Sequence, residues 1–308
     1  MTVELIPYWA RRILILWAFV SLAALPTPSA AAEVALSNGL VAHWSFESFE
    51  GKTTADASGN GHAATVGGAV RLKGLDGAGV RLETGDEGMF CPHADALSAG
   101  TALSLSAWVR PAHRGLGEYG TVVRKDGAYA LRFSGRSLGF LLWVDGRVHG
   151  LQSAFTDWVP DRWHHVAAVY DGDRMRLFVD GREDASSPST AAGPVDESGS
   201  PVCIGACRGR WRFPGTLDEV RLYARVLSSA EIRELRQRGL TALAEQGQRT
   251  IEPERVGEEK TEFRKPYREV TEVVDGFLWI DAEDFAEYGG WTLDTQFVHL
   301  MGSGYLLA

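Results

Sequence analysis

Short runs of β-forming residues, separated by Asp-Gly pairs, dominate the middle of the sequence. The pairs are Asp126-Gly127, Asp145-Gly146, Asp171-Gly172 and Asp180-Gly181. Both residues of such a pair tolerate the positive φ angles that tight hairpin turns require. The runs around them are GTVVRK, AYALRFS, LGFLLWV, HHVAAVY and RMRLFVD. They are rich in β-branched and aromatic residues, so the pattern predicts an antiparallel meander.

Similar runs extend this pattern in both directions, from about Asn38 to Tyr223. They are LVAHWSF and LSLSAWVR before the meander, and VCIGA and GTLDEVRLY after it. Many short strands at this spacing are typical of an all-β fold in which two antiparallel sheets pack as a sandwich or jellyroll. One short helix is expected after the last strand, in SSAEIRELRQRG, where Ser228 and Glu231 form a capping box and Gly239 can end the helix.

The composition changes on either side of this predicted sandwich. We expect a signal peptide at residues 1–32, a jellyroll domain at 38–239, a charged linker at 240–275 and the truncated start of a further domain at 276–308. The linker is predicted because acidic and basic residues alternate there with few apolar ones. The last segment ends on an apolar residue without a turn signal, which favours a fragment of a longer protein.

The amino terminus has the pattern of a secretory signal. Arg11 and Arg12 precede ILILWAFVSLAAL, and the small residues of PTPSAAA follow. About 13 apolar residues are too few to cross ~30 Å of hydrocarbon as a helix, although a retained membrane anchor is the alternative. Cleavage after Ala31 or Ala32 would give a secreted or periplasmic protein, and no other run is apolar enough to span a membrane.

Charge and cysteine content limit the partners and the redox chemistry. The formal net charge is −9 and no basic patch stands out, so nucleic acid is not an expected partner. The three cysteines, Cys91, Cys203 and Cys207, predict one disulfide and one free thiol in an oxidising compartment. The spacing leaves the pairing open.

The segment RWHHVAAVYDGDRMRLFVDG raises the possibility of a metal site, because two histidines are adjacent in it. Side chains alternate along a strand, so His164 and His165 should point to opposite faces and cannot jointly bind one ion. The segment therefore reads as a hairpin, and Trp163 is expected to be its buried anchor.

This hairpin resembles the central hairpin of laminin-G-like jellyroll modules in the concanavalin-A-like lectin/glucanase superfamily. GLVAHWSFE with DASGNGHAATV is similar to the opening strand and loop of these modules, LSLSAWVRP to a core strand, and FPGTLDEVRLYARVLSSAEIREL to the closing strand and helix. The resemblance covers Asn38 to Gln237 in the correct order. It implies two curved antiparallel sheets in which the first and last strands are neighbours.

The resemblance also implies a structural calcium ion beside the first loop. Asp56 and Asn60 offer the hard oxygen ligands that calcium prefers, and Asp218 should lie near them if the first and last strands pair. Glu47 is a fourth candidate. The alternative is an Asx turn around Asp56 and an exposed Asp218.

The sequence gives no positive case for catalysis. The central strands lack the two closely spaced carboxylates that the glucanases of this superfamily use, and no Gly-x-Ser-x-Gly elbow is present. Gly59-x-Gly61-x-x-Ala64 lacks the flanking strand and helix of a dinucleotide site. Residues 276–308 resemble the start of secreted bacterial FAD-dependent oxidoreductase or xanthan-lyase-like proteins, but no flavin or nucleotide site can be assigned in this chain.

Aromatic residues near the turns are the candidate ligand-binding residues. The aromatic residues that lie near turns, where a ring can stack on a sugar, are Trp143, Trp158, Trp211, Tyr119 and Phe155, with ordinary packing as the alternative. Trp211, Trp143 and Tyr119 are selected as the ligand-binding residues. The main hypothesis is a secreted recognition module that binds a glycan or an extracellular protein, as an accessory domain of a larger polysaccharide-processing protein. The rivals are a glycoside hydrolase or lyase of the same superfamily and a purely structural adhesion domain.

Overall fold

The computed structural model describes residues 35–82, 88–114, 119–186 and 192–245, and five short strands beyond residue 253 without their side chains. The chain divides into two compact units, Met1–Gly257 and Glu258–Ala308. The predicted signal peptide lies outside the described residues, as does most of the predicted linker. In the segment that resembles the FAD-dependent proteins, the strands alone are described. None of the helices in the described residues has the length and apolar character needed to cross a bilayer.

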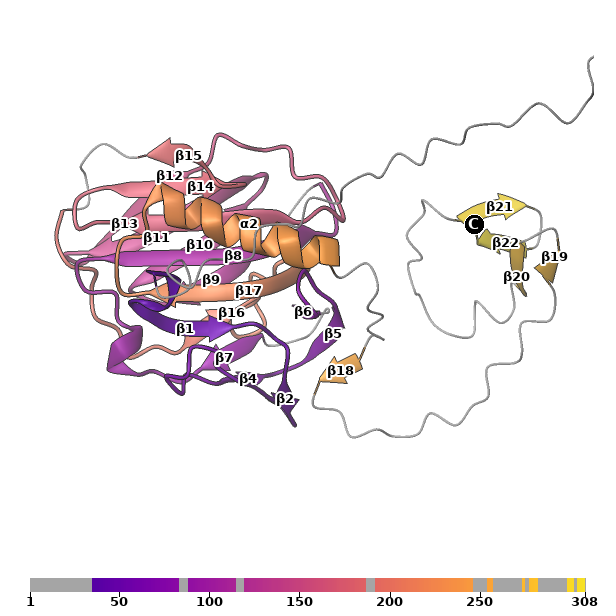
Figure 1. Cartoon of the computed structure of the whole chain (residues 1–308), viewed down its shortest axis with the longest axis horizontal. Helices are drawn as coiled ribbons and strands as arrows, with labels where there is room; N and C mark the ends of the chain where they lie inside the picture. Colours follow the sequence, from indigo (N-terminus) through magenta and orange to yellow (C-terminus); the bar gives the residue numbers. More distant parts are fainter. Residues whose placement is uncertain are drawn as a thin grey trace, which may run out of the picture. The chain divides into compact units, whose positions relative to one another are not determined.

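The first unit is a sandwich of two antiparallel sheets, as predicted (Figure 1). Sheet A has the strand order β15-β14-β13-β8-β17-β6-β5-β18, with β1 also paired to β17. Its strands are β1 Leu40–Trp44, β5 Ala69–Lys73, β6 Ala78–Arg81, β8 Leu103–Pro111, β13 His164–Tyr170, β14 Met175–Val179, β15 Arg182–Ser186, β17 Gly215–Tyr223 and β18 Glu254–Val256. The pairing of β1 with β17 confirms that the first and last strands of the jellyroll are neighbours.

Sheet B has the order β12-β11-β10-β9-β16-β7-β4-β3-β2. Its strands are β2 Phe49–Glu50, β3 Thr53–Thr54, β4 Ala64–Val66, β7 Met89–Cys91, β9 Gly120–Lys125, β10 Tyr129–Ser134, β11 Ser137–Val144, β12 Arg147–Gln152 and β16 Val202–Ile204. A short 3₁₀ helix, η2, covers Asp95–Leu97. In the second unit, the strands β19 Val273–Val274, β20 Phe277–Asp281, β21 Val298–Met301 and β22 Gly304–Leu307 form a sheet of order β19-β20-β22-β21.

The main core lies between the two sheets and follows the alternation of side chains along the strands. Its largest members include Trp44, Phe133, Phe140, Trp158 and Tyr170, all fully buried. A second cluster lies on the outer side of sheet A. Helix α2, Ser229–Glu245, packs there through Ile232 and Leu235 on residues of β13, β14 and β17 (Figure 1). Sheet A is therefore buried on both faces.

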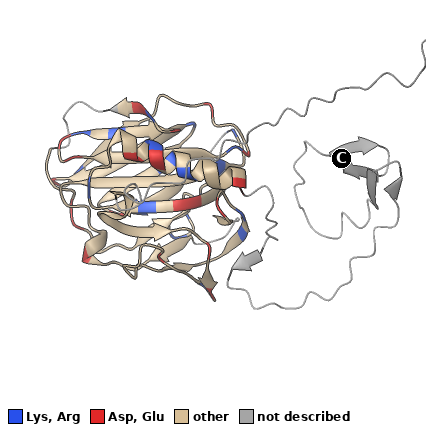
Figure 2. Cartoon of the chain, in the orientation of Figure 1, with Lys and Arg blue, Asp and Glu red and all other residues tan. Residues whose placement is uncertain are grey.

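Helix α2 begins as predicted but does not end at Gly239. The Ser228 backbone N–H donates to Glu231 Oε2 (2.8 Å) and the Glu231 N–H donates to Ser228 Oγ (3.2 Å), which is a capping box. The helix continues to Glu245, and its outer side carries alternating basic and acidic residues (Figure 2). Gly239 has a packing role instead, because a Cβ there would lie 2.5 Å from Trp108 Cζ2. The glycine lets the helix approach the sheet.

The predicted Asp-Gly turns are confirmed where their geometry is most demanding. Asp145 and Gly146 have φ angles of 57° and 70°, and Asp180 and Gly181 have 48° and 75°. Two successive residues with positive φ define the turn type that suits a two-residue hairpin. These turns join β11 to β12 and β14 to β15.

The adjacent histidines point to opposite faces of sheet A, as predicted. The His164 ring contacts Trp158 on the core side, with ring centroids 5.2 Å apart. The His165 ring contacts Trp108 on the side of helix α2, with centroids 5.3 Å apart. The expectation for Trp163 is wrong: it is only half-buried and stacks with Arg110 at 5.2 Å. Trp163 precedes β13, so strand alternation does not place it in the core.

The cysteine pairing that the sequence left open is now defined. Cys203 and Cys207 form a disulfide, and Cys91 is a buried free thiol. Burial raises the pKa of the Cys91 thiol to about 12. The thiol is therefore protonated and unreactive at neutral pH.

Candidate functional site

The three aromatic residues predicted to bind a ligand lie on one surface, the outer face of sheet B. Val123, Leu131 and Leu142 point into the core, so Arg124, Arg132 and Trp143 point outward from the same strands. We name this surface the aromatic–arginine platform. It consists of Tyr119, Arg124, Arg132, Trp143 and Trp211.

Two of the predicted tryptophans flank one arginine. The guanidinium carbon of Arg124 lies 4.6 Å from the centroid of Trp211 and 5.6 Å from that of Trp143. Both distances fall within the range of cation–π attraction. The Arg124 side chain is 13% exposed and is paired with Asp126, whereas Trp211 is 38% exposed. Trp211 therefore presents a large apolar surface whose position is fixed by a buried cation.

Tyr119 is paired in the same way with a second arginine. The guanidinium carbon of Arg132 lies 4.3 Å from the centroid of the Tyr119 ring. Arg132 is directly opposite Thr121 in the pairing of β10 with β9. Arg132 makes no ion pair with any described residue, and this distinguishes it from Arg124.

The segment that carries Trp211 is held by the backbone and by the disulfide. The Thr121 N–H donates to the Trp211 carbonyl oxygen (2.7 Å), so the segment runs alongside β9. Cys207 and Arg210 exchange backbone hydrogen bonds of 2.9 and 3.0 Å in a tight turn that the Cys203–Cys207 disulfide anchors. Trp211 itself has a φ of 53°, a costly conformation for a bulky residue. Such outliers are common at binding sites.

The sequence predicted the rings of the platform but missed the two central cations. Arg124 and Arg132 are single polar residues in the otherwise apolar strands GTVVRK and YALRFS. An arginine in a strand that is mostly buried indicates a side chain that leaves the core on the other face of the sheet. That signal was available but does not by itself point to a neighbouring tryptophan from a distant loop.

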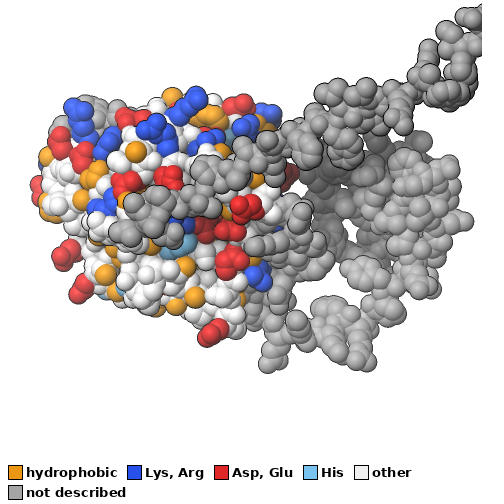
Figure 3. Space-filling model, viewed as in Figure 1, with side chains coloured by type: hydrophobic (Ala, Val, Ile, Leu, Met, Phe, Trp, Pro, Cys, Tyr) orange, Lys and Arg blue, Asp and Glu red, His pale blue; other side chains and the backbone are white. Residues whose placement is uncertain are grey.

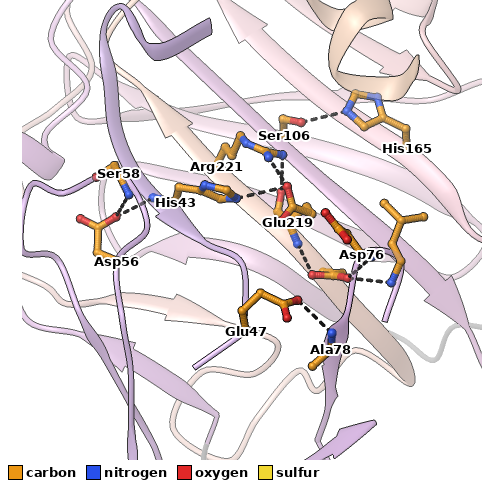
Figure 4. A network of polar contacts seen from close by, with 12 residues as sticks. His43, Glu47, Asp56, Ser58, Asp76, Ala78, Ser106, His165, Glu219 and Arg221 are labelled. Atoms are coloured by element: carbon orange, nitrogen blue, oxygen red, sulfur yellow. Dashed lines mark hydrogen bonds and ion pairs between the residues drawn. The ribbon is translucent and has the colours of Figure 1, made fainter. Parts of the chain in front are cut away.

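The residues predicted to bind calcium are split into two places. The Asp56 carboxylate accepts backbone N–H bonds of 2.9 Å from His43 and Ser58 (Figure 4). It also accepts one of 2.9 Å from His62. The Ser58 bond closes the Asx turn that was the alternative interpretation. Asn60 directs its side-chain amide at the carbonyl oxygens of β1, 2.9 Å from Leu40 and from Val41. Both side chains brace the first loop against β1.

Asp218 lies elsewhere, at a bulge in β17. The register of β17 against β8 shifts between Asp218 and Arg221, and Glu219 has a φ of 53°. Bulges often redirect side chains next to functional sites. Asp218 is fully buried rather than exposed, and its Oδ2 accepts the N–H of Leu75 (2.7 Å). Its Oδ1 accepts the N–H of Glu219 (2.7 Å).

Glu47 lies at the same loop as Asp218, which is residues 74–78. Its Oε1 accepts the Ala78 N–H (2.9 Å), and Phe46 before it has a φ of 59°. A Cβ on Gly74 would collide with the Asp218 carboxylate, and one on Gly77 with the Glu47 carboxylate. Glu47 and Asp218 therefore bond to the same loop, apart from Asp56 and Asn60. Among the described residues, no three acidic, histidine or cysteine side chains form a group that could hold a metal ion.

The two adjacent carboxylates of the bulge differ in acidity. Burial raises the pKa of Asp218 well above its usual value, and the neighbouring charge of Glu219 adds to the effect. Burial alone would also raise the pKa of Glu219, but Arg221 and His43 lower it to about 2. His43 Nε2 lies 3.2 Å from Glu219 Oε2 (Figure 4). Acidic side chains gather close to a histidine on the molecular face that carries α2 (Figure 3).

Two surface hollows occur away from both places. One has a volume of about 430 Å³ and is lined in part by Phe155, Asp180 and Arg236. The other has a volume of about 410 Å³ and is lined in part by His93 and Glu197. Neither is lined by Tyr119, Trp143 or Trp211. A platform that stacks flat rings does not need a deep hollow, so these hollows do not displace it as the candidate site.

Comparisons with known proteins agree with this fold. Residues 83–233 match the Laminin_G_3 family model, described as the concanavalin A-like lectin/glucanases superfamily. This match and the observed sandwich support the jellyroll domain that the sequence resemblance implied. The resemblance of residues 276–308 to FAD-dependent proteins finds no support. A search of curated proteins gave no significant match.

Several solved structures have a similar fold, and two of those described below are called binding domains. Domain 4 of AbnA, a GH43 extracellular arabinanase from Geobacillus stearothermophilus, in complex with arabinotriose, is 21% identical with a TM-score of 0.51, covering 64% of this chain and 97% of that one. The binding domain of Paraclostridial Mosquitocidal Protein 1 is 18% identical with a TM-score of 0.55, covering 65% of this chain and 52% of that one.

The ligand binding domain of botulinum neurotoxin serotype D, in complex with N-acetylneuraminic acid, is 13% identical with a TM-score of 0.55, covering 67% of this chain and 52% of that one. The match thus spans about half the length of these toxin domains. At such identities the likeness concerns the fold.

Proposed function

We propose that the jellyroll domain is a secreted recognition module that binds a glycan on the aromatic–arginine platform. The observation that carries the proposal is the placement of Arg124 between Trp143 and Trp211 on the open face of sheet B. A half-exposed ring offers a flat apolar surface for the C–H groups of a sugar ring. The adjacent Arg124–Asp126 pair offers a donor and an acceptor for hydroxyl groups.

The wider role we propose is that of an accessory domain in a larger polysaccharide-processing protein. Domain 4 of AbnA supports this proposal, because it belongs to an extracellular arabinanase and carries arabinotriose. A protein ligand is the second possibility, since one neighbour is the binding domain of botulinum neurotoxin DC in complex with rat synaptotagmin II.

A hydrolase or lyase on this surface is disfavoured by the carboxylates. A glycosidase needs two carboxyl groups that both reach the sugar, about 5–10 Å apart. Among the described residues, the carboxylate that forms an ion pair with a platform residue is Asp126, and its partner is Arg124. The adjacent acids Asp218 and Glu219 belong to sheet A, and backbone amides and Arg221 occupy them.

The experiment is a glycan-array and polysaccharide pull-down with the purified protein, with a reducing-end assay alongside. Trp211→Ala should reduce binding at least tenfold, because stacking a ligand ring on an aromatic side chain typically contributes more than about 1 kcal/mol to the binding free energy. Trp163→Ala is the matched control, since it removes another half-buried tryptophan stacked on an arginine, but in sheet A. Equal binding by both variants would contradict the platform, and release of reducing ends would favour the enzyme.

We also propose a structural calcium ion, held by Glu47 and Asp218 at the loop of residues 74–78 rather than by Asp56 and Asn60. Both carboxylates accept backbone N–H groups of this loop, and each follows or precedes a residue with positive φ, Phe46 and Glu219. A divalent cation would offset the cost of burying Asp218 as an anion. Such an ion would fix the loop to the closing strand, and it has no catalytic role in this proposal.

Melting curves with millimolar calcium or with EDTA test this ion. A ligand that binds only the folded protein stabilises it by about 2.7 kcal/mol at a hundredfold excess over Kd. Asp218→Asn should remove the calcium-dependent rise in Tm, whereas Asp56→Asn should lower Tm but leave the rise unchanged. If the wild-type protein melts identically in both buffers, the calcium proposal is wrong. If Asp56→Asn alone removes the rise, the ion lies at the first loop.

A further inference from the structure

The charge on the platform points to the class of glycan. The chain has a formal net charge of −9, so an excess of positive charge on one surface needs a reason. Arginines elsewhere in the described residues are often paired with acids, as are Arg114 with Asp157 and Arg225 with Glu231. On the platform, only Arg124 is neutralised in this way among the described residues, by Asp126.

Arg132 is a positioned guanidinium without a counter-ion. Its plane is held against the Tyr119 ring at 4.3 Å, and it makes no hydrogen bond or ion pair with the described residues. Its Nε is buried and has no hydrogen-bond partner. Arg132 as a whole is half-buried, and a partly buried cation without a counter-ion favours an anionic ligand.

Thr121 adds a second, independent observation at the same position. It lies directly opposite Arg132 in the sheet and is 1% exposed, yet its hydroxyl group also has no hydrogen-bond partner. Buried polar atoms nearly always have partners. Two unpartnered polar groups side by side, one a cation and one a hydroxyl, are suited to the two oxygens of a carboxylate.

The turn before Trp211 carries further positive charge. Arg208 and Arg210 are exposed there, and neither forms an ion pair with a described residue. They add two cations to the segment that carries Trp211. A polymer with repeated carboxylates can pair with several cations at once, whereas a single small anion cannot.

We infer that the platform selects carboxylated sugars, with Arg132 and Thr121 forming the subsite for the carboxylate. This inference rests on the proposed glycan-binding function and adds the substrate class. The guanidinium would pair with the carboxylate, Tyr119 would stack beside the sugar, and Trp211 would hold the next ring of the polymer. The shared chemistry is a pyranose ring with a carboxylate, as in a uronate or a sialic acid.

The experiment compares the binding of the purified protein to four probes. Polygalacturonate carries the carboxylates, and its methyl-esterified form has the same backbone without charge. Dextran sulfate is a polyanion without carboxylates, and a sialylated oligosaccharide separates sialic acid from uronate. We expect tight binding to polygalacturonate or to the sialylated probe, at least tenfold weaker binding to the methyl ester, and weakening with added salt.

The variants locate the effect. Arg132→Gln should weaken binding to the carboxylated probe about tenfold or more, because a charge-assisted hydrogen bond is lost. Arg132→Lys should recover only part of the affinity, since it keeps the charge but not the planar fork. Arg110→Gln is the control, because Arg110 also stacks on a tryptophan but belongs to sheet A. Unchanged melting temperatures would show that each variant is folded.

Other outcomes overturn the inference in distinguishable ways. The methyl ester and the acid could bind equally well, with binding lost in Trp211→Ala but not in Arg132→Gln. That result would refute the carboxylate subsite but retain the glycan-binding function. Equal binding of dextran sulfate would reduce the effect to general charge attraction. Absence of binding to these probes and to neutral glycans would refute the proposed function together with the inference.

Discussion

The two outer faces of the sandwich differ in what covers them. On sheet A, helix α2 packs over a second apolar cluster, and Trp108 and His165 are buried beneath it. On sheet B, several outward side chains of β9, β10 and β11 are half-buried, among them the platform residues Arg124, Arg132 and Trp143. One face is a second core, whereas the other is a surface of stacked rings and guanidinium groups.

This contrast predicts that the covered face contributes mainly to the stability of the domain and the open face mainly to ligand binding. Residues on the covered face have fixed partners, so their removal should change the free energy of unfolding. Residues on the open face have polar atoms without internal partners, so their removal should change binding and leave folding nearly intact. The comparison can be tested by making equivalent substitutions on the two faces.

The largest difference is expected between Trp108→Ala and Trp143→Ala. Trp108 is 1% exposed under α2, and its truncation should lower the free energy of unfolding by about 3–5 kcal/mol. Trp143 is half-buried on the platform, and its truncation should cost about 1 kcal/mol or less. Urea denaturation followed by far-ultraviolet circular dichroism measures both. Similar losses would mean that the platform is part of the core.

Gly239→Ala is expected to have the next largest effect, and its sign is informative. Alanine favours a helix over glycine by about 1 kcal/mol, so an isolated helix would gain stability. Here the new Cβ would meet the Trp108 ring, and overpacking should lower the free energy of unfolding by about 1–3 kcal/mol. Thermal unfolding shows whether the gain in helix propensity or the loss from overpacking is larger. A rise in Tm would show that α2 is not tightly packed on sheet A.

The third prediction concerns pH and the buried His165. Burial lowers the pKa of His165 to about 3, and the charge of Arg221 contributes. The folded state therefore excludes a proton that the unfolded chain binds below about pH 6.5. Stability should be full above pH 6.5 and fall as the pH decreases towards 3, by at most about 1.4 kcal/mol per unit.

His165→Gln isolates this contribution. Because the pKa of Asp218 is raised, its contribution to stability changes with pH in the opposite direction. The slopes of stability against pH are therefore compared between the variant and the wild type, rather than the total stabilities. Chemical denaturation between pH 7 and pH 4.5 should give a flatter profile for the variant. An unchanged slope would mean that His165 is protonated in the folded protein or that its burial is incomplete.

The smallest effect is expected at the start of α2. Ser228→Ala removes the hydroxyl group that accepts the Glu231 N–H, and loss of such a cap typically costs about 1 kcal/mol. Ser228→Asp should retain most of the stability, because a carboxylate can also cap a helix. Thermal melts of both variants test this ranking, and equal losses would contradict the capping role.

Most of the sandwich could be predicted because its long strands alternate clearly and its hairpins carry explicit turn residues. The region of residues 49–91 was not resolved into strands, since β2, β3, β4 and β7 have only two or three residues each. Such short strands lack a measurable period. The end of α2 was placed too early because Gly239 was interpreted as a terminator, whereas its neighbour Trp108 is distant in sequence.

The aromatic rings of the platform could be predicted from the sequence. Its arginines, and the positions of the predicted calcium ligands, could not. Tyr119, Trp143 and Trp211 were chosen for their places near turns, but their convergence depends on the pairing of β9 with β10 and β16. Asp218 and Glu47 bond to one loop and Asp56 and Asn60 to another part of the domain, an arrangement that the spacing in the sequence does not give. Contacts between distant segments decided each case.

The pairing of β1 with β17 also determines how the domain can be attached to something larger. The chain enters the sandwich through β1 and leaves it after β18, and both strands belong to sheet A. The platform lies on the outer face of sheet B. A tether at either connection, to a cell envelope or to a partner domain, would leave the platform directed away from the point of attachment and free to scan a surface opposite to it.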